Sequence, residues 1–246
     1  MNVLTRATCA FALAFAGAFG VTHAGTQING TRVIYPADER EVSVSLINND
    51  SAPRLLQAWV DSGDPTEKPS DSKAPFMVTP PMSRVDPGKG QTFRLMYTGS
   101  PLPTDRESVF WFNVLEVPPR PKAKGGEDNN YLQFAIRTRI KIFFRPKGLA
   151  GNPLSAIEQL TWRVTKDGKG FIAECTNNSP FNVSFSDVSF KSAPEAKDIA
   201  KGGMCPALGK TTFALRGNPD ASQGKLSLTA INDFGGFEPR EANFTR

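Results

Sequence analysis

The sequence predicts an all-β protein. Short runs of alternating apolar and polar residues recur along the chain, helical periodicity is nearly absent, and Pro, Gly, Asn and Asp separate the runs. The runs predict about fourteen strands, a number and spacing typical of β-sandwiches. The clearest expected strands span residues 31–35, 41–48, 55–61, 76–80, 91–97, 108–117, 132–145, 160–166, 170–175, 181–190, 211–216 and 225–233.

The first 24 residues differ from the rest and predict a secretory signal peptide. One cation, Arg6, precedes an apolar run that ends in small residues suited to cleavage after Ala24. The run is short for a membrane span, and no second one follows. We therefore expect a mature chain of 222 residues (246 − 24) without stable membrane insertion.

A break in the strand pattern divides the mature chain. Residues 145–153, RPKGLAGNP, carry two glycines and two prolines, which a strand interior does not accommodate. We expect two immunoglobulin-like sandwiches of about 100 residues each, over residues 25–146 and 147–246. A polar loop rich in Pro and Gly, residues 118–130, precedes the last strand of the first domain.

That last strand is predicted to be unusually long. Within YLQFAIRTRIKIFFRP (131–146), one row of alternate residues from Leu132 to Phe144 is almost wholly apolar, and the other row carries four cations. Fourteen such residues would extend roughly 46 Å, whereas ordinary strands have about five or six residues. The pattern indicates a strand with two unlike faces.

Charge and residue content exclude several functions. The net charge of +5 falls to +4 without the signal, since Lys+Arg drops from 29 to 28 and Asp+Glu stays at 24. This excess suits an acidic partner or a bound carboxylate, but it is too weak to indicate nucleic-acid binding. The sole histidine, His23, lies in the signal, which excludes Ser-His-Asp and Cys-His catalysis and the usual zinc sites. No P-loop motif occurs, so we expect neither cofactor nor metal, and nothing ties Glu107 and Glu116 into an enzymatic site.

Two cysteines remain in the mature chain, Cys175 and Cys205. In an oxidising compartment they are candidates for a disulfide, with two buried thiols as the alternative. Their separation of 30 residues is too wide for a CxxC redox pair.

Six motifs together give the sequence a specific resemblance to a known family. They are TRVIYP (31–36), QAWVD (57–61), VTPPMSRVDPG (78–88), LPTDRESVFWFNVLEVPP (102–119), IKIFFRP (140–146) and AINDFGG (230–236). In this order and at these separations they resemble the periplasmic chaperones of chaperone–usher pilus assembly. The resemblance implies two immunoglobulin-like sandwiches arranged as a boomerang around an inter-domain cleft. It also implies a periplasmic chaperone that folds and caps pilin subunits by lending them a strand, and then delivers them to the outer-membrane usher.

The resemblance assigns a role to the apolar row. Leu132, Phe134 and Ile136 correspond to the side chains that fill the open groove of a subunit. From Ile140 onward we expect the row to lie in the chain's own core. The tryptophans expected to fill the cores are Trp59, Trp111 and Trp162.

Arg32 and Lys141 match two cations that, in the family, anchor the C-terminal carboxylate of the subunit. Such an anchor would fix the register of the added strand, because a slip of one residue turns the apolar row outward. Lys141 and Leu132 have opposite parity along the strand, so either the cleft geometry or a bulge must reconcile their roles.

Glu107, Arg145 and Asp233 match a trio that bridges the two domains in the family. The expected partners are pilin subunits and the usher, and a free copy could cap its strand by forming a homodimer. The first domain lacks the cysteine pair typical of the long-loop branch of the family, which favours the short-loop branch. A pilus structural or adhesive subunit is the alternative, against which the cationic RTRIKIFFRP in mid-chain speaks.

Overall fold

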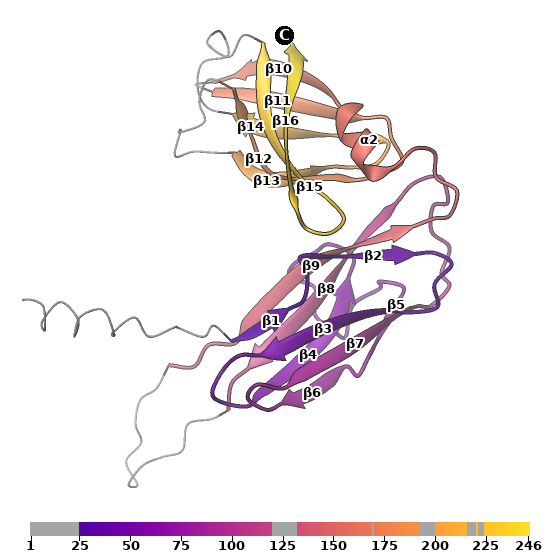
Figure 1. Ribbon diagram of the computed structural model, residues 1–246, viewed down its shortest axis with the longest axis vertical. Helices are drawn as coiled ribbons and strands as arrows, with labels where there is room; N and C mark the ends of the chain where they lie inside the picture. The colour runs from indigo at the N-terminus through magenta and orange to yellow at the C-terminus, as the bar shows by residue number, and fades with distance from the viewer. Residues whose placement is uncertain (1–24, 120–131, 169, 192–199, 216–219, 221–223) are drawn as a thin grey trace, which may run out of the picture.

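The computed structural model describes residues 25–119, 132–168, 170–191, 200–215, 220 and 224–246, and it places them in two β-sandwich domains (Figure 1). The expected signal peptide and most of the loop 118–130 lie outside the described residues. The all-β prediction is confirmed. The first domain contains β1 (Thr26–Ile28), β2 (Arg32–Pro36), β3 (Val42–Asn48), β4 (Arg54–Asp61), β5 (Phe76–Thr79), β6 (Met82–Val85), β7 (Gly90–Tyr97), β8 (Ser108–Val117) and β9 (Ile136–Arg145). The second contains α2 (Pro153–Glu158), β10 (Thr161–Asp167), β11 (Gly170–Asn177), β12 (Val183–Phe190), β13 (Ala200–Cys205), β14 (Gly209–Leu215), β15 (Lys225–Ile231) and β16 (Phe237–Thr245).

Two sheets face each other in the first domain. Their strand orders are β1-β3-β7-β5 and β2-β9-β8-β4-β6. The alternation of each strand places Tyr35, Phe93, Phe112 and Ile142 between the sheets, where they are fully buried. Burying each such side chain contributes about 1.5–3 kcal/mol, which makes this core the main source of the domain's stability. Within the described residues, no helix is long and apolar enough to cross a membrane.

The N-terminal part of the first domain is divided between the two sheets. β1 pairs with β3, whereas β2 pairs in parallel with β9, and Gly30 between them has a φ of 111° that glycine adopts readily and other residues rarely do. β2 covers only Lys141–Arg145 of β9, while β8 covers Ile136–Phe144. Ile136–Ile140 therefore has β8 on one edge and, among the described strands, no neighbour on the other.

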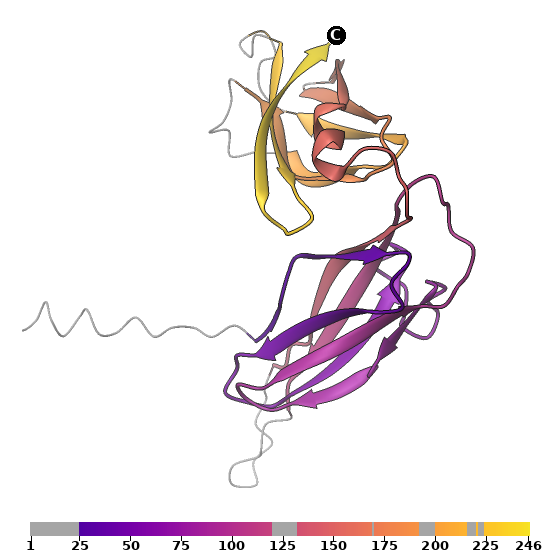
Figure 2. The same cartoon turned by 45° about the vertical axis from the view of Figure 1, so that its right-hand side comes forward.

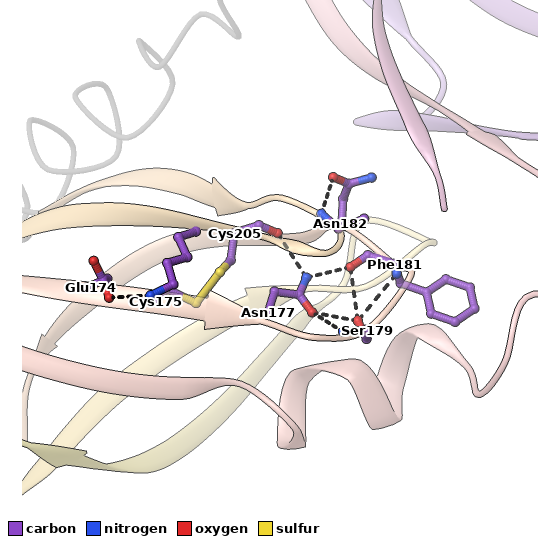
Figure 3. The surroundings of a disulfide bond; sticks show 9 residues. Glu174, Cys175, Asn177, Ser179, Phe181, Asn182 and Cys205 are labelled. Carbon is purple, nitrogen blue, oxygen red and sulfur yellow. Dashed lines mark hydrogen bonds and ion pairs between the residues drawn. A yellow bond between two sulfur atoms is a disulfide. The ribbon is translucent and has the colours of Figure 1, made fainter. Parts of the chain in front are cut away.

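Seven strands form one sheet in the second domain, in the order β13-β12-β15-β16-β10-β11-β14, around a second core. The predicted disulfide between Cys175 and Cys205 is confirmed, and both cysteines are buried (Figure 3). The bond joins β11 to β13. Because these strands stand near opposite ends of the strand order, it holds the two edges of the sandwich together.

Replacing both cysteines with alanine is expected to destabilise the protein by about 3–4 kcal/mol, because a 30-residue loop is no longer closed in the unfolded chain. Urea unfolding monitored by tryptophan fluorescence measures this, since Trp162 lies in the core of the second domain. Equal unfolding midpoints for the variant and the oxidised wild-type protein would contradict the expectation.

The sequence analysis missed β1, β6, β13, β16 and α2. β13 contains Gly202 and Gly203, and a Cβ at Gly202 would lie 2.5 Å from the carbonyl oxygen of Phe185. The close approach of strands requires glycine there, which weakens any strand signal. α2 has only six residues, too few to show a helical period, although Asn152 caps it by accepting a hydrogen bond from Ser155 N.

β9 begins at Ile136, so the prediction of a strand from Leu132 was wrong by four residues. β8 ends at Val117, and Glu116 is its last residue paired with β9, opposite Ile136. Beyond that point the chain has no neighbouring strand to supply a hydrogen-bond ladder. Leu132 to Ala135 is therefore not a strand in the free protein.

Only Trp162 lies in a core cluster. Trp59 is buried, at 8% exposed, but it lies outside both core clusters, and the expectation was wrong for Trp111. Both lie on the outer face of the five-stranded sheet beneath Arg137 and Arg139. An aromatic residue in a strand predicts that its side chain is covered, but not that it faces the core. Here the guanidinium groups of Arg137 and Arg139 cover the two indole rings on the outer face of the sheet.

Candidate functional site

Arg32 and Lys141 lie side by side where the unpaired edge of β9 ends. They are register partners in the parallel β2–β9 pair, so their side chains emerge on the same face. Both reach the second domain: Arg32 Nη1 donates to Ile231 O at 3.0 Å, and Lys141 Nζ donates to Ser184 Oγ at 3.1 Å. The hairpin of β15 and β16 approaches this point in both ribbon views (Figure 1, Figure 2).

A small hollow of about 230 Å³ surrounds the two cations in the inter-domain cleft. The tip of the β15–β16 hairpin closes one side of it. A Cβ on Gly235 would lie 2.5 Å from Thr31 Oγ1, and the φ of Gly235 is 83°, so both the close approach and the backbone require glycine. The lining residues are Thr31, Arg32, Trp111, Arg139, Ile140, Lys141, Ile231, Gly235 and Phe237.

Neither cation has an acidic side chain within ion-pairing distance in the part of the chain that the structure describes. Burial lowers the pKa of Lys141 to about 8, and the positive charge of Arg32 contributes to the lowering. Burial also lowers the pKa of Arg32, an effect that the charge of Asp233 partly offsets. Arg32 Nε is buried without a hydrogen-bond partner. Two desolvated cations with spare donors form a site for an anion, and a carboxylate suits both of them.

The other cations of β9 are each paired with a carboxylate of the chain. Arg137 and Arg139 both pair with Asp61, at 3.1 and 2.6 Å. Arg145 pairs with carboxylates from both domains. Of the cationic row, only Lys141 has no acidic partner among the described residues.

The apolar row that was expected to fill a partner's groove is exposed. Leu132, Phe134 and Ile136 are 80, 68 and 55% exposed. The same row continues through Ile140 to Phe144, which are buried in the core of the first domain. The chain's own core thus extends along one face of the strand and ends in open, apolar side chains.

The opposite parity of Leu132 and Lys141 does not require a bulge. The register between β8 and β9 runs without interruption from Ile136 to Phe144. Even-numbered side chains of β9 face the core or its exposed continuation, while Lys141 faces the second domain together with Arg32. Within β9 no bulge is present, and Lys141 lies on the opposite face from Ile136, the one residue of the exposed apolar row that belongs to the strand.

Arg145 binds both carboxylates of the trio, Glu107 in its own domain and Asp233 in the second domain. Its Nε donates to Glu107 Oε1 at 2.7 Å, and its Nη1 and Nη2 donate to Asp233 at 2.8 and 3.0 Å. Burial lowers the pKa of Arg145, but hydrogen bonds to Asp233 and the charge of Glu107 outweigh this and raise it overall. Glu107 N also donates to Pro180 O at 2.9 Å. The charge-assisted bonds and this backbone bond fix how the domains sit around the cleft.

The sequence analysis missed the loop that receives Glu107. Asn182 donates to Glu107 Oε2 from its backbone nitrogen at 2.8 Å and from Nδ2 at 3.2 Å. Asn177 holds this loop beside the disulfide, where its Nδ2 donates to Cys205 O at 3.3 Å (Figure 3). The run NNSPFN (177–182) predicts a turn, but nothing in its sequence indicates that the turn binds Glu107 of the other domain.

The described residues hold no cluster of three potential metal ligands. Glu107 belongs to the inter-domain bridge. Glu116 accepts from Thr26 N at 2.9 Å and pairs with Arg54 at 3.2 Å. Nine residues of a strand separate the two glutamates by roughly 30 Å, too far for paired acid–base catalysis.

Comparison with known proteins agrees with this geometry. Residues 25–150 match the family described as Pili and flagellar-assembly chaperone, PapD N-terminal domain, and residues 155–242 match Pili assembly chaperone PapD, C-terminal domain. The chain is 45% identical over 211 residues to the fimbrial chaperone YadV of Escherichia coli K12, covering 85% of each chain. It is 43% identical over 223 residues to Chaperone protein FimB/FhaD of Bordetella pertussis, covering 87% of this chain and 86% of that one.

Two solved structures extend the match to three dimensions. The crystal structure of the YadV chaperone superposes with a TM-score of 0.70 at 41% identity, over 89% of this chain and 100% of the other. The SafB chaperone, solved in complex with Salmonella enterica SafA pilin, superposes with a TM-score of 0.73 at 26% identity, over 91% of this chain and 98% of the other. Since the family matches cover both domains, the chain belongs to the PapD family of pilus-assembly chaperones.

Proposed function

We propose that this chaperone, a non-enzymatic assembly factor by its family, binds pilin subunits by lending them the free edge of β9. One observation carries the proposal: the unpaired edge of β9 lies between an exposed apolar row and two cations that have no acidic partner among the described residues. The relative SafB, which was solved with a pilin bound, supports the choice of partner.

The backbone of Ile136–Ile140 supplies the first part of the interaction. A subunit that lacks a strand exposes unpaired amide and carbonyl groups, which is an aggregation hazard. Adding the free edge of β9 satisfies those groups, and Leu132 to Ala135 becomes a continuation of the strand on binding.

The apolar row supplies the second part. Leu132, Phe134 and Ile136 enter the open core of the subunit, and their burial contributes roughly 5–8 kcal/mol before the cost of association is subtracted. Because these side chains extend the apolar row that continues into the core of the first domain, subunit and chaperone then share one continuous core.

Arg32 and Lys141 supply the third part by binding the terminal carboxylate of the subunit. The anchor sits where β2 begins to cover β9, so it stops the incoming strand at one position. A shift of one residue would turn the alternate side chains of the subunit away from the apolar row.

The finer assignments follow from the same scheme. Residues 25–146 form the domain that donates the strand, and residues 147–246 complete the cleft. The chaperone works in the periplasm, releases the subunit at the outer-membrane usher, and shields its own apolar row as a homodimer when no subunit is present. The inter-domain pairs of Glu107, Arg145 and Asp233 hold the cleft open at a fixed angle. A role as a pilus subunit is not favoured, since both domains match chaperone families.

Co-expression with the cognate pilin in the periplasm tests the proposal. The expected product is a soluble 1:1 complex, measured by size-exclusion chromatography with light scattering. An equal yield of soluble pilin from cells lacking the chaperone would refute the proposed function.

Binding is also expected to weaken as the pH rises through about 8, where buried Lys141 loses its charge in the free protein. A bound carboxylate raises the pKa of Lys141, so above pH 8 each binding event takes up a proton. Affinity then falls by up to about tenfold per pH unit. Titration calorimetry with a pilin C-terminal peptide between pH 7 and 9.5, in buffers of different ionisation enthalpy, measures both effects.

The stability of the free protein should change in the opposite direction over the same interval. The folded-state pKa of about 8 is below the ordinary value of 10.5, so between these values the unfolded state binds more protons. The contribution of Lys141 to the free energy of unfolding therefore rises with pH in this window. An affinity that stays constant from pH 7 to 9.5 would contradict the role of Lys141.

A further inference from the structure

The outer face of β9 carries a buried polar cluster that the proposed function does not use. Asp61, the last residue of β4, is 0% exposed, and its carboxylate accepts hydrogen bonds from four donors. These are Arg139 Nη2 at 2.6 Å, Arg137 Nη2 at 3.1 Å, Asn113 Nδ2 at 2.8 Å and Gly63 N at 2.8 Å. A carboxylate removed from water in this way is stable only because every donor is in place.

Asn113 and two tryptophans complete the cluster. Asn113 Oδ1 accepts from Arg137 Nε at 3.0 Å and from Arg139 Nε at 3.1 Å. Arg137 stacks over Trp59 at 4.7 Å and Arg139 over Trp111 at 4.6 Å, measured to the ring centroids. We name this set the Asp61 clamp; it consists of Trp59, Asp61, Trp111, Asn113, Arg137 and Arg139.

The clamp holds β9 where the sheet pairs with only one edge of the strand. Arg137 and Arg139 lie in Ile136–Ile140, the half of the strand that β2 leaves uncovered. The partners of the two arginines come from β4 and β8, so the clamp ties three adjacent strands together across their outer face. Lysine could not replace either arginine, because each guanidinium uses Nε and Nη2 in different hydrogen bonds while its plane stacks on an indole.

We infer that the Asp61 clamp is a positioning device for strand donation, an inference that rests on the proposed function. It holds the free half of β9 in one register and with one face outward before any subunit arrives. A slip of one residue would place Ile136 or Thr138 against Asp61 and leave that carboxylate buried without its donors.

The clamp has a second consequence for the anchor. It occupies the Nε and Nη2 donors of Arg137 and Arg139 with Asn113 and an internal carboxylate, so these donors are not free for the terminal carboxylate of a subunit. Arg32 and Lys141 remain the one docking point for it on this strand. The clamp thereby removes alternative registers of the subunit as well as of β9.

Hydrogen exchange in the free protein tests the clamp separately from subunit binding. The variants are Arg137→Met, Arg139→Lys and Asp61→Asn. Arg137 is the more exposed of the two arginines, so Arg137→Met should disturb the fold least and keeps the test possible if Asp61→Asn does not fold. Well below the unfolding temperature, amides of residues 136–140 should exchange at least tenfold faster than in the wild type, while those of 141–145 change less than threefold. Arg94→Met is the matched control, since Arg94 forms an exposed ion pair with Glu41 at 3.7 Å on the opposite sheet.

The functional arm measures how fast each variant captures urea-unfolded cognate pilin upon dilution. The clamp variants should be about tenfold slower, and Arg139→Lys should not rescue the rate. Equal acceleration of exchange in both halves of β9, no acceleration, or an unchanged capture rate would each overturn the inference. The two proposals can fail separately. If the wild-type protein captures no pilin, the proposed function is refuted. If amides 136–140 still exchange faster in the clamp variants, the clamp nevertheless holds this half of β9 in place.

Discussion

Replacing Lys141 with methionine is expected to weaken subunit binding strongly and to stabilise the free protein at the same time. The pKa of Lys141 is lowered from 10.5 to about 8, which corresponds to about 3 kcal/mol of unfavourable burial at neutral pH. Methionine removes this cost but also removes the hydrogen bond to Ser184 Oγ, worth about 1 kcal/mol. The net gain of about 1–2 kcal/mol should raise the melting temperature by several degrees.

The loss of affinity in this variant should be large. A carboxylate that enters the cleft would lose one of its two charge-assisted partners while still being desolvated. Truncating one partner of such a pair costs about 2–5 kcal/mol, which is roughly 30-fold to several thousand-fold in affinity. Calorimetry with the cognate pilin peptide and a thermal melt of the free variant measure both effects.

Lys147→Met is the matched control for this prediction. Lys147 follows β9 closely, but it is exposed and lies 3.7 Å from Asp38. Its removal should change neither binding nor melting temperature measurably. If Lys141→Met binds as tightly as the wild type, Lys141 is a buried structural cation and not an anchor.

The sequence predicted the two-sandwich fold because alternation and turn residues are local signals. It also indicated which side chains of β9 lie in the core, since Ile140 and Phe144 continue a strict period of two. It could not show where β9 ends towards its N-terminus, because that depends on whether another strand lies alongside. Strand β16, which the sequence analysis did not predict, illustrates the limit of local signals: its exposed and half-buried positions alternate without a strong apolar row.

The site was predictable only in part for a related reason. Resemblance to the family pointed to Arg32 and Lys141, but neither residue differs in sequence from the other cations of the strand. What sets Lys141 apart is that Arg137 and Arg139 both pair with Asp61, from a distant part of the chain, whereas Lys141 has no acidic partner among the described residues. Such pairings depend on register between strands far apart in sequence.

Replacing Phe134 with glutamate is expected to abolish subunit binding without affecting the stability of the free protein. Phe134 is 68% exposed and lies outside any strand. The free energy of unfolding of the variant should therefore be within about 0.5 kcal/mol of the wild-type value. In the complex the same position enters the core of the subunit. The variant then loses about 2–3 kcal/mol of apolar burial and must in addition desolvate a charge, so no complex should be recovered on co-expression.

Two matched variants decide what such a loss means. Ala135→Glu introduces the same charge one residue along, at another exposed position on the alternate row, and should retain at least a tenth of wild-type complex. Ile140→Glu places the charge in the buried part of the row and should unfold the first domain. If Phe134→Glu and Ala135→Glu reduce binding equally, the segment attracts or repels subunits by charge alone. If Phe134→Glu unfolds the free protein as Ile140→Glu does, the row belongs to the chaperone's own core and cannot be donated. Only a binding defect at Phe134 with an intact fold fits a strand that is exposed in order to complete another protein's core.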